Sequence, residues 1–307
     1  FNVSSKRDGS PLSIPFFVST YRTEFSPPKE LEDAVFYNKL DLKPLSREVS
    51  RDLIDKLLLN IEIEQNKKIE LLEKSKGNPF FIEEWVSLVK ESHSFTEPLD
   101  ESRGIGSNYS IPNSLNALIL ARIDSLQSDL KVLLQKATII GEDFFVQILS
   151  KLEKKLGLKD EIQSPINNLE KEDFIKHFIN QLDHYRFKHI LTRDVAYSTI
   201  LKSNKKILHS AVAEIIEENF SDKLDLFYFD LAIHYDISEK HDQAIKFLSL
   251  AGEKNIIVSD YVHAEQCFNR LIDIISNNKP YSDSLNCFES PDISDGDKSV
   301  IKTYIES

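Results

Sequence analysis

Glu83 and Glu84 are adjacent carboxylates, a residue type that general acid–base catalysis uses. Consecutive side chains on one helix point about 100° apart, so these two cannot easily share a substrate proton. We therefore expect both on a solvated helix face that complements the positive helix N-terminus, with neighbouring Trp85 in the core. The sequence contains no HExxH motif or other local nucleophile–base signature, and Cys267 and Cys287 form no CxxC pair.

A second candidate is the turn Gly77-Asn78-Pro79, which precedes two phenylalanines in the segment KSKGNPFFIEEWV. Glycine permits a positive φ or a close approach to another group. Proline stiffens the turn, presents an apolar face and is favoured at the first position of a helix. From these residues alone the turn is either a plain break between two helices or a rigid contact surface for a ligand.

The overall composition indicates ordinary soluble globular material. Of 307 residues, 41% are hydrophobic and 29% are charged, and the net charge is −12. This negative balance argues against a broad nucleic-acid surface, and no apolar run approaches the roughly 18 residues of a membrane span. The scarcity of cysteine fits a reducing, cytoplasmic setting. Because the chain starts at Phe1 and has no methionine, we expect it to be part of a longer polypeptide.

The elements that would position these residues follow from hydrophobic spacing. The segment SIPFFVSTYR, 13–22, predicts a short buried strand. The pattern over 45–72 is helical, with Ser46 as the predicted N-cap, and 80–89 predicts an amphipathic helix. The polar segment 93–110 is expected to be a linker.

Helical order is predicted to return after this linker. Apolar stripes predict helices near 115–126, 130–137 and 144–156. The segment YRFKHILTRDVAYSTIL, 185–201, begins as a strand and becomes helical. Three helices followed by a β-rich hairpin indicate a winged-helix arrangement.

From 205 onward the pattern is entirely helical, and small residues alternate with large apolar ones. That spacing is typical of helix pairs that stack closely in a solenoid. Lys202, Lys205 and Lys206 form a small basic patch, but the acidic balance does not favour DNA contact. Ser, Asp and Asn predominate after 279, so we expect weak order there. The small residues are Ala232, Ala244, Ala251 and Ala264.

Several segments together resemble a known family, the AAA/STAND-type ATPase modules. The resemblance covers roughly residues 13–275 and rests on GNPFFIEEWV, SIPNSLNALILARIDSL, LLQKATIIGEDF, YRFKHILTRDVAYSTIL and LAIHYDISEKHDQAIKFLSLAGEK. Such modules follow class III nucleotidyl cyclase domains of the soluble adenylyl cyclase type, and occur in some bacterial Ser/Thr kinases and LuxR-type regulators. The Walker A motif, GxxxxGK[ST], and the acidic Walker B strand are absent from this sequence.

The resemblance implies a mainly α chain with the end of a P-loop α/β core, a helical lid, a winged helix and TPR-like helical repeats. The implied divisions are 1–43 for the end of the core with its sensor strand, 44–92 for the lid, 93–110 for the linker, 111–201 for the winged helix, 202–278 for the repeats and 279–307 for a weakly ordered tail.

The resemblance also assigns nucleotide contacts. In the turn Gly77-Asn78-Pro79, the proline would pack on adenine and the backbone would face the edge of the base. Arg22 would be a sensor near the γ-phosphate, where a planar and permanently charged guanidinium suits phosphate oxygens. The alternative for Arg22 is a surface ion pair with Glu24.

His189 would contact the β-phosphate of ADP, because histidine can donate a hydrogen bond to phosphate and titrates near neutral pH. The family usually has Asp or Pro after this histidine, whereas Ile190 follows it here. The alternative is a packed structural histidine beside Phe187 and Ile190.

These expectations combine into a regulatory fragment of an ATP-binding signalling switch. ATP or ADP with Mg²⁺ would bind mainly to an upstream core; ADP would hold lid and winged helix closed, and ATP would release them. The chain alone is expected not to hydrolyse ATP. The preferred effector is a class III cyclase, with a Ser/Thr kinase or LuxR-type regulator as alternatives. A further alternative is a scaffold with an inert ATPase remnant, whose repeats bind a partner protein.

Overall fold

The computed structural model describes residues 18–21, 25–34, 37–59, 61–94, 111–157, 162–178 and 183–277. The chain divides into two units, Phe1–Lys43 and Pro44–Ser307. Helices predominate among the described residues, whose strands form one three-stranded sheet. The prediction of a mainly α chain is therefore confirmed.

In the first unit, α1 (Lys29–Glu32) is a single short turn of helix with no buried residue. Residues 18–21 belong to no strand, and Val18 is 75% exposed. The predicted buried strand over 13–22 is therefore wrong for 18–21, because a buried strand needs neighbouring strands to satisfy its backbone groups. Arg22 lies outside the described residues.

The second unit begins with three helices, α2 (Arg47–Leu58), α3 (Gln65–Ser75) and α4 (Pro79–Ser94). Ser46 caps α2 as predicted, since its Oγ accepts a hydrogen bond from the Val49 N–H at 3.3 Å. The predicted helical region over 45–72 is interrupted, because Leu59 has a φ of 51° and ends α2.

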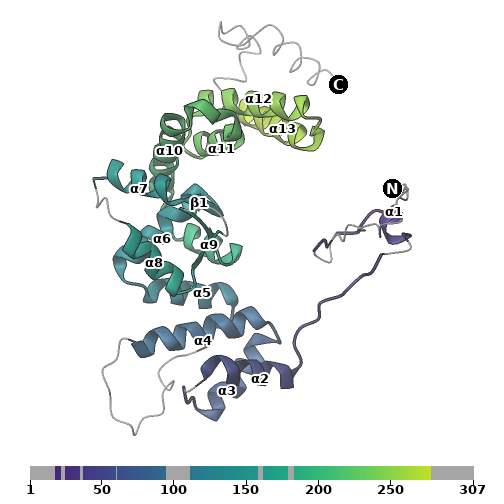
Figure 1. Cartoon of the computed structure of the whole chain (residues 1–307), viewed down its shortest axis with the longest axis vertical. Helices are drawn as coiled ribbons and strands as arrows, with labels where there is room; N and C mark the ends of the chain where they lie inside the picture. Colours follow the sequence, from purple (N-terminus) through teal and green to yellow (C-terminus); the bar gives the residue numbers. More distant parts are fainter. Residues whose placement is uncertain are drawn as a thin grey trace, which may run out of the picture. The chain divides into compact units, whose positions relative to one another are not determined.

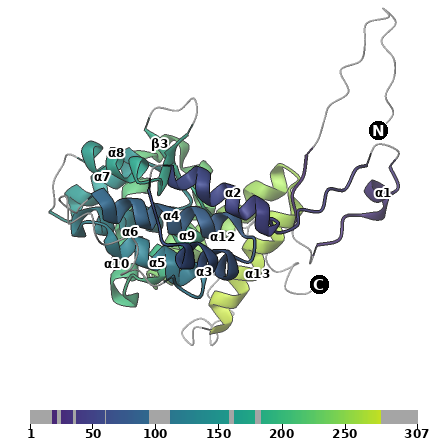
Figure 2. The same ribbon diagram turned by 90° about the horizontal axis from the view of Figure 1, so that it is seen from below.

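These helices pack around one hydrophobic core. In both views, α4 lies alongside α2 (Figure 1; Figure 2). Trp85 is fully buried in this core, as predicted, and Ile111 and Leu118 from the chain after 110 complete it. α4 therefore has its apolar face covered on both sides by helices from the same unit.

A second group of elements surrounds the small sheet. Its elements are α5 (Leu115–Ser125), α6 (Ser128–Ile140), β1 (Asp143–Phe145), α7 (Val146–Lys155), α8 (Gln163–Lys171), β2 (Ile175–His177), β3 (His184–Phe187) and α9 (Ile190–Ser198). The sheet is antiparallel with the order β1-β3-β2. Phe144 pairs with Tyr185, and Lys176 pairs with Arg186, so β3 is the central strand.

β3 followed directly by α9 confirms the predicted change from strand to helix over 185–201. Hydrophobic spacing does not predict β1 or α8. The helix expected over 144–156 begins only at Val146, because Phe144 is taken into the sheet, where it is 1% exposed. Backbone pairing with a distant strand overrides the local helical pattern there.

The remaining described elements are α10 (Lys202–Asn219), the 3₁₀ helix η1 (Ser221–Leu226), α11 (Tyr228–Ile237), α12 (His241–Ile257) and α13 (Tyr261–Asn277). Figure 1 shows α11, α12 and α13 as successive packed helices. The alanines at 232, 244, 251 and 264 are all buried, which confirms the predicted close helix contacts. At Gly252, an added Cβ would lie only 2.6 Å from the Phe268 ring.

Candidate functional site

The predicted turn has a backbone that requires glycine. Lys76 and Gly77 both adopt left-handed conformations, with φ of 50° and 76°. A Cβ on Gly77 would lie 2.4 Å from the Leu45 carbonyl oxygen. Leu45 and Gly77 are also hydrogen-bonded to each other, since the Leu45 N–H donates to the Gly77 carbonyl oxygen at 2.8 Å. The glycine thus fixes the chain entering α2 against the end of α3.

Asn78 and Pro79 form the start of α4. The Asn78 Oδ1 accepts a hydrogen bond from the Phe80 N–H at 3.0 Å, and Pro79 occupies the first helical position. Both residues are exposed. The geometry therefore accounts for the turn as a helix start, and it also leaves the apolar ring of Pro79 facing outward.

The structure brings Phe80, the residue after this turn, against His189. The Phe80 ring, directly after Pro79, lies 3.9 Å from the His189 imidazole between centroids, with the rings tilted by 39°. His189 is the residue before α9, so the contact joins the start of α4 to the start of α9. Its Nε2 is buried and has no hydrogen-bond partner among the described residues. The residue that follows the predicted turn therefore contacts the predicted histidine.

The surroundings of His189 carry excess positive charge. Burial lowers the pKa of the His189 imidazole, and Lys188, Lys176 and Arg122 lower it further, while Asp173 opposes them. Lys188 forms an ion pair with Asp173 at 2.5 Å. The imidazole is consequently neutral near pH 7, with a buried ring nitrogen able to make one further hydrogen bond.

Glu84 lies in the core and not on a solvated face, which corrects the sequence-based expectation. Its carboxylate accepts a hydrogen bond from Arg122 Nη1 at 2.8 Å, and the two residues are 2% and 1% exposed. Arg122 also donates to the Glu172 carbonyl and lies 4.3 Å above the centre of the Phe174 ring. Burial raises the pKa of Glu84, and Arg122 opposes this shift. Glu83 is half-buried.

Three partners of this site were not predicted from the sequence: Phe80, Lys188 and Arg122. Phe80 and Lys188 are each adjacent to a predicted site residue, so their positions in the sequence could have indicated that they belong to the site. Arg122 had none, because a buried cation on an apolar helix is recognisable only once its countercharge is known. Arg22 and its alternative partner Glu24 lie outside the described residues, so neither role is placed.

The predicted basic patch on α10 is partly occupied by internal contacts. Lys206 forms an ion pair with Glu239 at 2.5 Å, and the Lys205 ammonium lies 4.0 Å from the centre of the Tyr197 ring. Within the described part of the chain, no group of three or more His, Cys, Asp or Glu side chains could hold a metal ion. No described helix has both the length and the apolar character to cross a membrane.

Comparison with protein-family models finds no match to this chain, and comparison with curated protein sequences finds none either. The feature that most directly suggests a ligand site is the contact between Phe80, next to the turn at 77–79, and His189.

Proposed function

We propose that this chain is the regulatory part of an ATP-binding signalling switch of the AAA/STAND type, attached to a class III adenylate or guanylate cyclase. In this proposal, α2–α4 are the helical lid, α5–α9 with the sheet are the winged helix, and α10–α13 are TPR-like repeats. ATP or ADP with Mg²⁺ would be bound mainly by a P-loop core belonging to the same polypeptide.

The order of elements around the sheet supports the winged-helix assignment. Within 111–201, α5 and α6 precede β1, α7 and α8 separate β1 from β2, and β2 and β3 form an antiparallel pair. The first strand lies on the far side of β3, giving the order β1-β3-β2. The hairpin of β2 and β3, which follows the helices as predicted, would be the wing; β1 and α8 are additions to the predicted pattern.

The observation that carries the proposal is the Phe80–His189 contact. It joins the turn that would face adenine to the histidine that would face phosphate, although the two are far apart in sequence. The buried, unpartnered Nε2 fits a phosphate oxygen as its acceptor, and the nearby lysines favour a negative ligand. These residues thus suit the anionic end of a nucleotide.

The proposed mechanism is a population shift between two packings of the lid and the winged helix. A diphosphate that accepts a hydrogen bond from His189 would stabilise the packing in which Phe80 covers the imidazole. A ligand lacking that contact would favour separation of α4 from α9. A ligand shifts this equilibrium only by its difference in affinity for the two packings, so His189 would set the size of the response.

The test is a titration of the 307-residue chain with ADP, ATP and adenosine, monitored through the imidazole NMR signals. We expect ADP with Mg²⁺ to shift the His189 signals, and His189→Asn to weaken ADP binding about tenfold through loss of the phosphate contact. Adenosine binding should be unaffected by this substitution. The chain alone should not hydrolyse ATP.

His263→Asn is the matched control, because His263 is exposed and pairs with Asp260 on the surface at 2.7 Å. Equal ADP affinity in wild type and His189→Asn, or His189 signals that do not move with ADP, would remove the phosphate-sensing role. Measurable ATP turnover by this chain would reveal a catalytic site absent from the proposal.

A second candidate function is a protein-interaction scaffold. It is favoured by the exposed apolar side chains around the turn between α12 and α13. Ile257, Val258, Tyr261 and Val262 are each more than 60% exposed there. On this reading, the repeats bind a partner protein and the helices before them only support the array. His189→Asn would then leave both ADP response and partner binding unchanged.

A further inference from the structure

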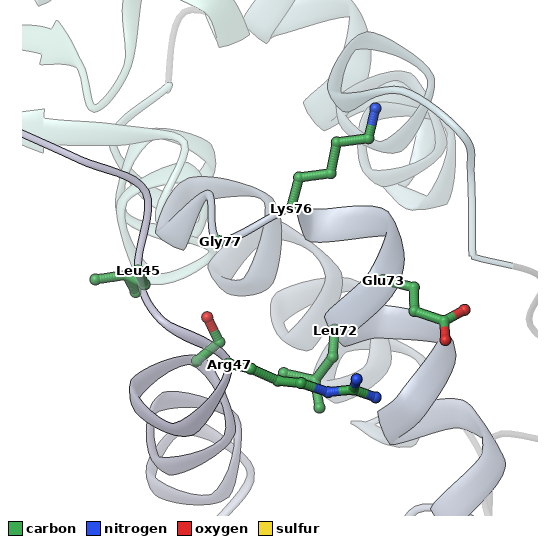
Figure 3. Close-up of a pocket in the computed structure, with 7 residues that line it drawn as sticks. Leu45, Arg47, Leu72, Glu73, Lys76 and Gly77 are labelled. Carbon is green, nitrogen blue, oxygen red and sulfur yellow. The ribbon is translucent and has the colours of Figure 1, made fainter.

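A pocket opens where the start of α2 meets the end of α3. It has a volume of about 230 Å³ and includes Leu45, Leu72 and Gly77 in its lining. Figure 3 shows Arg47, from the first turn of α2, extending towards Leu72 on α3. Asn78, Pro79 and His189 do not line this pocket. The pocket therefore adjoins the candidate site described above and shares only Gly77 with it.

Ser50 gives the pocket an unsatisfied buried hydroxyl. The residue lines the pocket and is only 2% exposed, and its Oγ has no hydrogen-bond partner among the described residues. By contrast, the hydroxyls of the helical residues Ser75 and Ser198 each donate a hydrogen bond to the backbone carbonyl three residues earlier in the same helix. A buried hydroxyl without a partner is unfavourable, so an acceptor supplied by a ligand would relieve it.

The start of α2 adds donors and positive charge to the same pocket. The N–H groups of the first turn have no intrahelical acceptors. The Val49 N–H is capped by Ser46, so those of Arg47 and Glu48 are the donors for a ligand, and the helix N-terminus carries a partial positive charge. Arg47 is the first residue of this 12-residue helix, is exposed, and forms no ion pair with a described residue. A guanidinium beside a helix N-terminus is a geometry that binds phosphate well.

The other two charged lining residues have opposite effects. Lys76 is exposed, and in Figure 3 its side chain extends away from Arg47, so its contribution to the pocket is smaller. Glu73 also lines the pocket and is exposed. Its carboxylate repels an anion in the pocket, so removing the charge of Glu73 should strengthen anion binding.

We propose that this pocket binds a phosphoryl group, held by the Arg47 guanidinium, the Ser50 hydroxyl and the first-turn N–H groups of α2. The ligand is a free phosphate or the terminal phosphate of a phosphate ester, and both offer the same acceptor oxygens. The proposal does not depend on the proposed function, because its ligating groups, Arg47, Ser50 and the start of α2, belong to none of that site's residues, and only Gly77 lines both. The pocket would hold the phosphoryl group against the junction of α2 and α3.

The experiment measures binding of inorganic phosphate and of ATP to the 307-residue chain by calorimetry, at constant ionic strength. We expect Arg47→Gln to weaken phosphate binding about tenfold, as loss of one charge-assisted contact should. Ser50→Ala should weaken it severalfold while leaving the melting temperature of the free chain unchanged or higher, because it removes an unpaired buried hydroxyl. Glu73→Gln should tighten binding. Lys76→Gln should have the smallest effect.

Arg51→Gln is the matched control, because Arg51 is an exposed cation on the same helix that does not line the pocket. Phosphate binding that Arg51→Gln and Arg47→Gln reduce equally would reflect only net charge and would overturn the proposal. Absence of phosphate binding in the millimolar range, or binding that survives Ser50→Ala and Arg47→Gln but is lost in His189→Asn, would also overturn it. Tighter binding of ATP than of phosphate identifies a phosphate ester as the ligand, and equal binding identifies free phosphate.

Discussion

Two helix junctions in the second unit bury polar side chains, and they do so in opposite ways. Between α4 and α5, a charged pair is retained, with Glu84 and Arg122 in contact at 2.8 Å. Between α10 and α11, His209 Nδ1 and His234 Nδ1 lie 2.7 Å apart, and both residues are under 5% exposed. Here the imidazoles carry no positive charge near pH 7, because burial lowers the pKa of His209 to about 4 and of His234 to about 3.

The difference lies in the neighbouring groups. Arg122 has a carboxylate, the Glu172 carbonyl and the Phe174 ring around it, so its charge is compensated. Arg193 instead opposes protonation of both histidines, and Lys205 also opposes protonation of His209. Buried groups keep their charge only where opposite charge and hydrogen-bond partners are supplied together.

The histidine junction is therefore a neutral hydrogen-bonded chain. One Nδ1 carries a proton and donates the hydrogen bond, and the other Nδ1 accepts it. At its other end, the Tyr197 hydroxyl contacts His209 Nε2 at 3.0 Å. This chain connects α9, α10 and α11. Protonating one imidazole places a charge in the buried pair, and protonating both places two charges in contact.

The largest loss of stability is expected when one charge is removed from the α4–α5 junction. Arg122→Met should lower the free energy of unfolding by about 3–5 kcal/mol, because it leaves the Glu84 carboxylate buried without its partner. Replacing both residues, as Arg122→Met with Glu84→Leu, should recover most of that loss. Urea denaturation monitored by Trp85 fluorescence measures both variants.

Lys131→Met provides the control for this prediction. Its ion pair with Asp124 is at 2.6 Å but is largely exposed, so the loss should be under about 1 kcal/mol. If Arg122→Met costs no more than Lys131→Met, the buried pair does not hold the junction together.

Acidification should weaken the α10–α11 junction next. Both histidines have folded pKa values below the ordinary 6.5, so the unfolded chain takes up protons first as the pH falls. Stability is thus complete above about pH 6.5 and is lost towards about pH 4, at about 1.4 kcal/mol per pH unit for each histidine. Urea denaturation between pH 7 and 5 measures this slope.

His234→Gln should reduce the pH slope by about half, because only one titrating group remains in the junction. His263→Gln, on the surface, should leave the slope unchanged. An unaltered slope in His234→Gln would mean that the acid sensitivity arises elsewhere in the chain.

A smaller effect is expected where Gly252 of α12 packs closely against Phe268 of α13. Gly252→Ala should destabilise the chain by about 1–3 kcal/mol, since the new Cβ would lie 2.6 Å from the Phe268 ring. Combining it with Phe268→Leu should cost less than the sum of the single changes. Thermal unfolding gives this coupling energy.

Gly157→Ala is a useful contrast, because an added Cβ there meets nothing within 4 Å, although φ is 75°. Its cost should come from the backbone alone and should not depend on Phe268. Independent, additive effects of Gly252→Ala and Phe268→Leu would show that the close contact is relaxed in solution.

Sequence patterns determined most of the helices of the second unit. The Ser46 cap, the buried Trp85 and the alanines of the α11–α13 array are all visible from spacing of a few residues. These features depend on neighbours three or four positions away, which the sequence displays directly. The turn at 77–79 was similarly readable, because glycine and proline restrict the backbone wherever they occur.

Only the tertiary structure decided which side chains and strands that are distant in sequence pair with each other. Glu84 was expected in solvent, and the countercharge that allows its burial comes from Arg122 on another helix. β1 depends on pairing with β3, and the Phe80–His189 contact joins two helix starts that are distant in sequence. Local patterns fix which face of a helix is apolar, but burial of a polar group depends on a long-range partner, and that partner is chosen only when the chain has packed.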